Sequence, residues 1–117
     1  MRNDVEWLKD ILNAIGQIEK YALNGKEKYM LDELIQTWMI HHLQIIGEAA
    51  NKLSTTIQEK HTEVKWYQIV GMRNLIIHEY FGVDLEEIWN TVVNDIPIFK
   101  VTILKMIKDF NKLPLWD

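Results

Sequence analysis

The chain has 117 residues, enough for one ordinary domain, and we expect a single domain over 1–117. It contains no Cys, which excludes a disulfide framework and a thiolate zinc site. The formal net charge of −4 disfavours a general nucleic-acid binder, because such proteins usually carry a basic excess. The apolar runs are far shorter than the roughly 20 residues of a membrane span, and the charged N-terminus lacks the apolar core of a signal peptide. We therefore expect a cytoplasmic protein without membrane contact.

Apolar residues recur at spacings of three and four along the whole chain, which predicts an all-α fold. A first helix is expected over about Asp4–Ala22, ended by Gly25, because glycine readily takes the left-handed conformation that ends helices. A second, long helix is expected over about Glu27–Leu53. Its apolar side chains spread over more than one face, so it should contact neighbours on two sides, inside a bundle or across a dimer interface. Gly47 would permit a close helix crossing there.

The second half of the chain predicts two more helices. After a polar connection that reaches Glu63, a third helix is expected over about Val64–Tyr80, ended by Gly82. The fourth apolar stripe runs from Leu85 to Phe110. Antiparallel packing of these segments gives a bundle of four to five helices.

Two residues mark irregular points of the fourth helix. Asp84 is expected to cap its N-terminus, with Glu87 three residues later. Pro97 cannot donate a backbone hydrogen bond to the Val93 carbonyl. We therefore expect a kink at Pro97, or a fresh helix capped by Asp95.

The third predicted helix carries a polar block that interrupts its apolar pattern. Arg73, Asn74, His78 and Tyr80 lie within eight residues, around the apolar segment 75–77. At about 100° per residue, Asn74 and His78 share one side of a helix, and Arg73 and Tyr80 share another. Arg73 and His78 are separated by about 140°, so one intact helix would not aim both at the same phosphate. Either the helix loosens near His78, or two copies of the block face each other across a dimer axis, and we favour the second arrangement.

The block resembles the signature of the HepT-like branch of the HEPN superfamily, in which Arg is followed after four residues by His and after one more by Tyr. The resemblance extends over about the whole chain. It includes the segments Ile46-Gly47-Glu48-Ala49-Ala50, Trp66-Tyr67-Gln68-Ile69-Val70-Gly71-Met72 and Phe81-Gly82-Val83-Asp84.

The resemblance implies an all-α, HEPN-like homodimer that acts as a metal-independent endoribonuclease and needs no cofactor. It assigns catalysis to Arg73 and His78. It also implies a toxin–antitoxin pair, in which the antitoxin is a nucleotidyltransferase of the MNT type. Tyr80 would accept adenylyl groups from ATP, and the added phosphate charge beside the RNA cleft would exclude substrate.

The residue types fit metal-free RNA cleavage. His78 would take the proton of the ribose 2′-hydroxyl, and Arg73 would bind the phosphate through two hydrogen bonds. Asn74 would orient the imidazole or the phosphate. Attack by the 2′-hydroxyl leaves a cyclic phosphate and a 5′-hydroxyl end, and DNA lacks that nucleophile. Glu48 is a candidate ion-pair partner that would orient the Arg73 guanidinium.

Other interpretations stay open. The chain could be a catalytically silent HEPN subunit that holds substrate for a nucleotidyltransferase, or a purely structural dimeric bundle. A metal site is not expected, because His41 and His42 point about 100° apart on a helix and do not chelate together.

Overall fold

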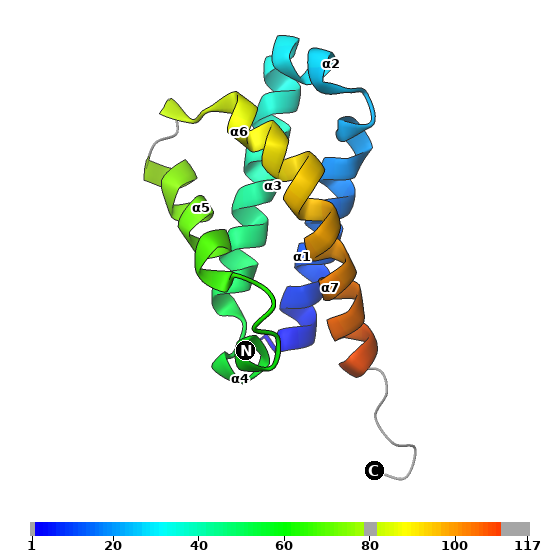
Figure 1. Cartoon of the computed structure of the whole chain (residues 1–117), viewed down its shortest axis with the longest axis vertical. Coiled ribbons are helices and arrows are strands. Elements are labelled where there is room, and N and C mark those ends of the chain that lie inside the picture. The colour runs from blue at the N-terminus through cyan, green and yellow to red at the C-terminus, as the bar shows by residue number, and fades with distance from the viewer. Residues whose placement is uncertain (1, 79–81, 111–117) are drawn as a thin grey trace.

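The fold is a helical bundle in which α3 is the central element. In the computed structural model, which describes residues 2–78 and 82–110, α3 (Glu33–Lys52) packs against α1 (Asp4–Ala22) on one side and α5 (Trp66–His78) on the other. The last helical segment lies against α1 (Figure 1). The predicted all-α bundle is confirmed, and so are the bounds of the first helix. In the described part of the chain, no helix combines the length and apolar character needed to cross a membrane.

The prediction of one long second helix is wrong, because the chain breaks at Asp32. The short helix α2 (Lys26–Leu31) ends there, and the Asp32 backbone is extended at φ −120° and ψ 104°. Its carboxylate accepts hydrogen bonds from the backbone N–H groups of Leu34 and Ile35. Asp32 therefore acts as an N-cap that satisfies free donors at the start of α3. The central helix does contact neighbours on two sides, as its broad apolar sector predicted.

The segment expected as a polar connection contains a further short helix, α4 (Thr55–Lys60). The Ser54 hydroxyl caps it by accepting from the Ile57 N–H, and also donates to the Asp4 carboxylate at 2.6 Å. The bond to Asp4 joins the start of α4 to the start of α1. The next helix, α5, begins at Trp66, two residues later than predicted, and its expected end near Tyr80 lies outside the described residues.

The last stretch is helical from α6 (Leu85–Asn90) through α7 (Ile96–Phe110), with a π-helical turn, η2 (Thr91–Asp95), between them. Asp84 caps α6 as predicted, accepting from the Glu86 and Glu87 N–H groups. No fresh helix begins at Asp95, because the backbone of Ile96 stays helical and its N–H donates to the Thr91 carbonyl. The irregularity expected at Pro97 thus takes the form of a widened turn just before it, which relieves the conflict between a proline ring and the carbonyl four residues earlier.

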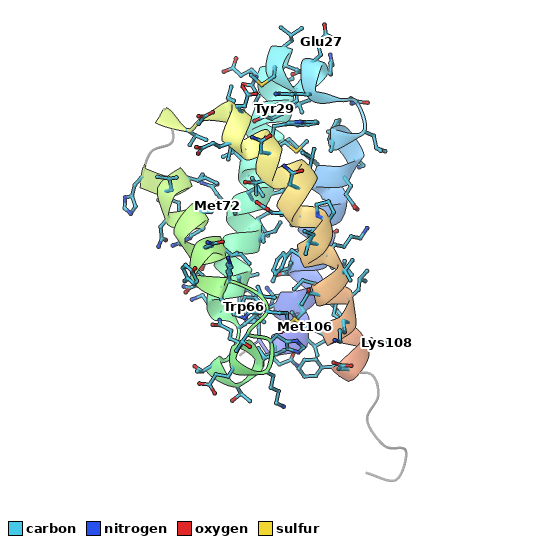
Figure 2. The ribbon with its side chains drawn as sticks, in the orientation of Figure 1. Glu27, Tyr29, Trp66, Met72, Met106 and Lys108 are labelled. Atoms are coloured by element: carbon cyan, nitrogen blue, oxygen red, sulfur yellow. The ribbon has the colours of Figure 1, made fainter. Side chains whose placement is uncertain are left out.

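Two aromatic contacts hold the outer helices to the bundle, and Figure 2 labels one residue of each, Tyr29 and Trp66. The buried Tyr29 of α2 donates its hydroxyl to the Leu85 carbonyl at 2.7 Å and stacks near Trp89 of α6. Burial raises the pKa of Tyr29 to about 12, so the hydroxyl keeps its proton for that bond. At the opposite end, Trp66 of α5 meets Phe99 of α7 edge to face, with ring centroids 6.0 Å apart.

Candidate functional site

The contact between α3 and α5 sets the position of Arg73. At Gly47, α3 offers no side chain, and the stem of Arg73 lies directly against it. A Cβ atom added at Gly47 would overlap the Arg73 Cβ and come within 2.8 Å of its Cγ and 3.3 Å of the Ile69 carbonyl oxygen. The close helix crossing predicted at this glycine is therefore present, and it brings the Arg73 side chain up to α3.

The Arg73 guanidinium is held by two acceptors. Its Nη2 atom lies 2.6 Å from Glu48 Oε2, and its Nη1 atom donates to Asn74 Oδ1 at 2.9 Å. The side chain is 28% exposed, so the charge sits at the edge of the protein rather than in its core. The structure thus brings together three of the predicted site residues, with the guanidinium fixed in place and reachable from solvent. An exposed ion pair of this kind contributes little to stability, typically below about 1 kcal/mol, so its orienting effect matters more.

The fourth predicted residue, His78, lies apart from this cluster. The chain remains α-helical through His78, so the helix does not loosen before it. His78 and Asn74 are both exposed on the outer side of α5, and among the described residues no hydrogen bond to the His78 ring is present. The geometry therefore leaves Arg73 and His78 on different sides of one helix. Tyr80, the predicted modification site, lies outside the described residues.

The outer side of α5 is unusually apolar for a surface. Tyr67 and Leu75 are 72% and 56% exposed, respectively. Gly71 lies on the same side, and a Cβ atom added there would meet nothing within 4 Å. Only two α5 side chains, Trp66 and Ile76, are buried. Neighbouring exposed apolar groups of this kind mark interaction surfaces.

A groove of about 440 Å³ runs beside the Arg73 cluster. The helices α1, α3 and α5 all contribute to its lining. Its lining residues are Trp7, Asp10, His41, Gln44, Ile45, Glu48, Ala49, Arg73 and Ile77. Three of these residues, Trp7, Asp10 and Gln44, were not predicted at the site from the sequence. Gln44 could have been found, because it precedes Glu48 by four residues and so shares its helix face.

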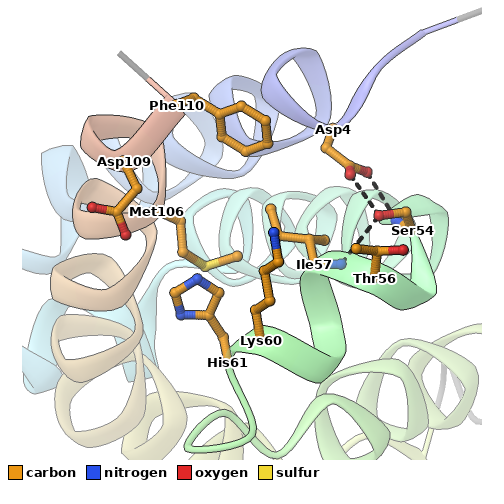
Figure 3. Close-up of a pocket in the computed structure, with 9 residues that line it drawn as sticks. All are labelled: Asp4, Ser54, Thr56, Ile57, Lys60, His61, Met106, Asp109 and Phe110. Atoms are coloured by element: carbon orange, nitrogen blue, oxygen red, sulfur yellow. Dashed lines mark hydrogen bonds between the residues drawn. The ribbon is translucent and has the colours of Figure 1, made fainter. Parts of the chain in front are cut away.

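A second hollow, of about 510 Å³, lies where the starts of α1 and α4 meet the end of α7 (Figure 3). It contains His61 and the hydrogen-bonded pair Asp4 and Ser54, and it shares no lining residue with the groove at Arg73. Residues 2–78 and 82–110 contain no group of three His, Asp or Glu side chains placed to hold a metal ion. His42 is buried, with its Nδ1 atom 2.8 Å from the Trp38 carbonyl oxygen, whereas the adjacent His41 is exposed.

Comparison with known proteins matches residues 11–106 to the family described as Ribonuclease HepT-like. The chain is 37% identical over 114 residues to a Methanocaldococcus jannaschii protein named as a gamma-glutamylcyclotransferase and candidate RNase, covering 96% of this chain and 51% of that protein. It is 37% identical over 100 residues to a "Probable ribonuclease HepT" of Thermococcus cleftensis, and the match covers 85% of this chain and 91% of that protein. It is 40% identical over 80 residues to a candidate RNase of Caldanaerobacter subterraneus, and the match covers 68% of this chain and 71% of that protein. The chain therefore spans about half of the first relative and most of the second. No solved structure gives a significant match.

The contact at Gly47 generates a stability prediction. Gly47→Ala should lower the free energy of unfolding by about 1–3 kcal/mol, because the added methyl group overlaps the Arg73 stem and forces α5 away from α3. Gly16→Ala is the matched control, since Gly16 is an exposed helical glycine with open space around it. That control should be neutral or stabilising by up to about 1 kcal/mol. Urea unfolding of both variants measures the difference, and equal stability of the two would contradict the packing described.

Proposed function

Because the chain belongs to the ribonuclease HepT-like family, we propose that it is a metal-independent endoribonuclease whose catalytic residues are Arg73 and His78. The observation that carries this proposal is the geometry of α5. Arg73 is oriented by Glu48 and Asn74 yet remains reachable from solvent, and His78 is exposed one turn further along the same helix. A fixed cation for a phosphate and an accessible imidazole are the two groups that metal-free RNA cleavage requires.

In the proposed reaction, the His78 imidazole takes the proton of a ribose 2′-hydroxyl. The 2′-oxygen attacks the adjacent phosphorus, and the bond from phosphorus to the 5′-oxygen breaks as that oxygen takes up a proton. The products are a 2′,3′-cyclic phosphate and a 5′-hydroxyl end. Arg73 stabilises the charge that develops on the phosphate through hydrogen bonds from its planar guanidinium. DNA lacks the attacking hydroxyl and should not be cleaved.

The active site in this proposal is composite, formed by two copies of the chain. Arg73 and His78 point in directions about 140° apart on an intact helix, so a single copy does not aim both at one phosphate. The exposed Tyr67 and Leu75 and the open position Gly71 give the outer side of α5 an apolar surface that a second copy would cover. We propose that the two-fold axis of this dimer brings His78 of each copy to Arg73 of the other, whose guanidinium is reachable from solvent at the edge of α5.

The proposal includes control by a partner protein. On the resemblance of the Arg73–Tyr80 block, the chain is the toxin of a toxin–antitoxin pair, and an MNT-type nucleotidyltransferase is its antitoxin. Transfer of an adenylyl group from ATP to the Tyr80 hydroxyl releases pyrophosphate and leaves a phosphodiester beside the site. Its negative charge and bulk would repel RNA.

A second candidate function is a catalytically silent subunit that holds substrate for a nucleotidyltransferase. The feature that favours it is the Glu48–Arg73 ion pair, which neutralises the charge that would bind phosphate. In that case His78 would have no role in RNA turnover.

The catalytic assignment predicts a specific loss of activity. Cleavage of mixed RNAs, including transfer RNA, should proceed in the presence of a chelator. His78→Ala and Arg73→Ala should each slow cleavage by about 100-fold or more, because each removes a group that acts in the transition state. His61→Ala is the control, since His61 pairs with Glu63 away from the site and its loss should leave the rate unchanged. Equal cleavage by native protein and His78→Ala would refute the assignment.

The composite site predicts that activity requires association through α5. Gly71→Gln should yield a folded monomer that does not cleave RNA, because the added side chain has open space within one copy but would block the approach of a second. Gly16→Gln places the same side chain at another open helical glycine and should remain dimeric and active. Sedimentation and cleavage assays report the two properties. A dimeric, active Gly71→Gln protein would exclude this interface.

The proposed modification of Tyr80 is tested by measuring the mass of the protein after treatment with the partner enzyme. Incubation with an MNT-type nucleotidyltransferase and ATP should add adenylyl groups to the native chain and abolish RNA cleavage. Tyr80→Phe should gain no mass and stay active under the same treatment, whereas Tyr67→Phe should be modified like the native chain. The same mass gain in Tyr80→Phe would assign the modification elsewhere.

A further inference from the structure

The groove beside Arg73 combines apolar walls with hydrogen-bonding groups. Ile45 and Ala49 on α3 and Ile77 on α5 line it with apolar groups, and Trp7 lines it from α1. Polar side chains of α3 project into the same space. Small-molecule sites typically occupy about 300–1,000 Å³ and have this mixed character, and the groove's 440 Å³ lies in that range.

The two carboxylates of the groove each form an ion pair with an arginine. Glu48 pairs with Arg73, and Asp10 pairs with Arg2, whose guanidinium also lies 4.2 Å from the centre of the Trp7 ring. Each carboxylate that would otherwise repel an anion is therefore paired with a cation. A phosphate that approaches Arg73 meets the remaining in-plane N–H donors of its guanidinium, which can bind the phosphate while Glu48 keeps the guanidinium in place.

Two further polar side chains of the groove are not held by an ion pair or a side-chain hydrogen bond within the part of the chain that the structure describes. Among the described residues, neither the Gln44 amide nor the His41 ring makes a side-chain hydrogen bond, although both line the groove. The Gln44 amide presents a donor and an acceptor together, which matches the edge of a nucleobase. The neighbouring His42, by contrast, is occupied by the Trp38 carbonyl.

We infer that this groove binds one unpaired nucleotide of the RNA, next to the phosphate that Arg73 contacts, with Gln44 and His41 contacting its base. The inference rests on the proposed ribonuclease function and extends it to substrate recognition. A single-stranded segment fits, because only an unstacked base can enter a side groove and expose both its faces and its edge. The base would lie between apolar groups of α3 and α5, with Trp7 of α1 beside it.

The test separates binding from cleavage by using His78→Ala protein as the parent, with fluorescent single-stranded oligoribonucleotides of each base as probes. Adding Gln44→Ala should raise the Kd about threefold to tenfold, the range of one hydrogen bond, and should change the order of preference among the bases. The isosteric Gln44→Glu change should weaken binding further, because it replaces the amide donor that contacts the base with a negative charge in a groove that binds polyanionic RNA. Gln68→Ala is the control, since Gln68 lies on α5 outside the groove and lines a different hollow.

The outcomes distinguish this inference from the function on which it rests. If native protein cleaves RNA and the Gln44 variants bind every probe as the parent does, the groove assignment alone is overturned. A shift of the Gln44 variants from dimer to monomer with unchanged Kd also overturns it, because the groove would then be an interface between copies. If native protein cleaves no RNA and the parent binds none, the proposed function fails and the groove assignment fails with it.

Discussion

The close packing of α5 on α3 at Gly47 is the constraint on which the candidate site depends. Because Gly47 has no side chain, the Arg73 stem lies against the α3 backbone, and its guanidinium reaches Glu48 one residue along. The same contact turns the rest of α5 outward, so that Asn74 and His78 are exposed together with apolar residues that would be buried in an ordinary bundle helix. One crossing thus places the cation, exposes the imidazole and leaves an apolar surface without a partner.

Much of the fold follows from sequence pattern, and the errors have local causes. The first helix was predicted to the residue, because a clear apolar stripe and a turn at Gly25 bound it. The break at Asp32 was missed because the apolar spacing continues across it, while one capping carboxylate changes the chain direction. The short α4 was missed because its single buried residue, Ile57, gives no periodic signal. At Pro97 the sequence left open a kink or a fresh helix capped by Asp95, and the widened turn found before the proline is a third solution that apolar spacing does not reveal.

The predicted part of the candidate site comprises residues of one helix, α5, and Glu48 of α3, which lies in a segment that resembles the family. Spacing and resemblance predicted the eight-residue block and offered Glu48 as the ion-pair partner of Arg73, and the ion pair is confirmed. The contribution of α1 to the groove could not be predicted, because no spacing within α1 relates Trp7 or Asp10 to Arg73, more than sixty residues later in the chain. The composite arrangement stays a prediction that the separation of Arg73 and His78 within one copy supports.

The most direct measurement of the composite site mixes two inactive proteins. In a dimer formed from one Arg73→Ala chain and one His78→Ala chain, one of the two composite sites combines an intact Arg73 from one copy with an intact His78 from the other. Unfolding and refolding the two variants together should therefore restore cleavage to about a quarter of the native rate, since half of the dimers are mixed and each has one intact site. If each active site instead takes both residues from one copy, every site in the mixture lacks a catalytic group. Activity no higher than that of the separate variants would contradict the account.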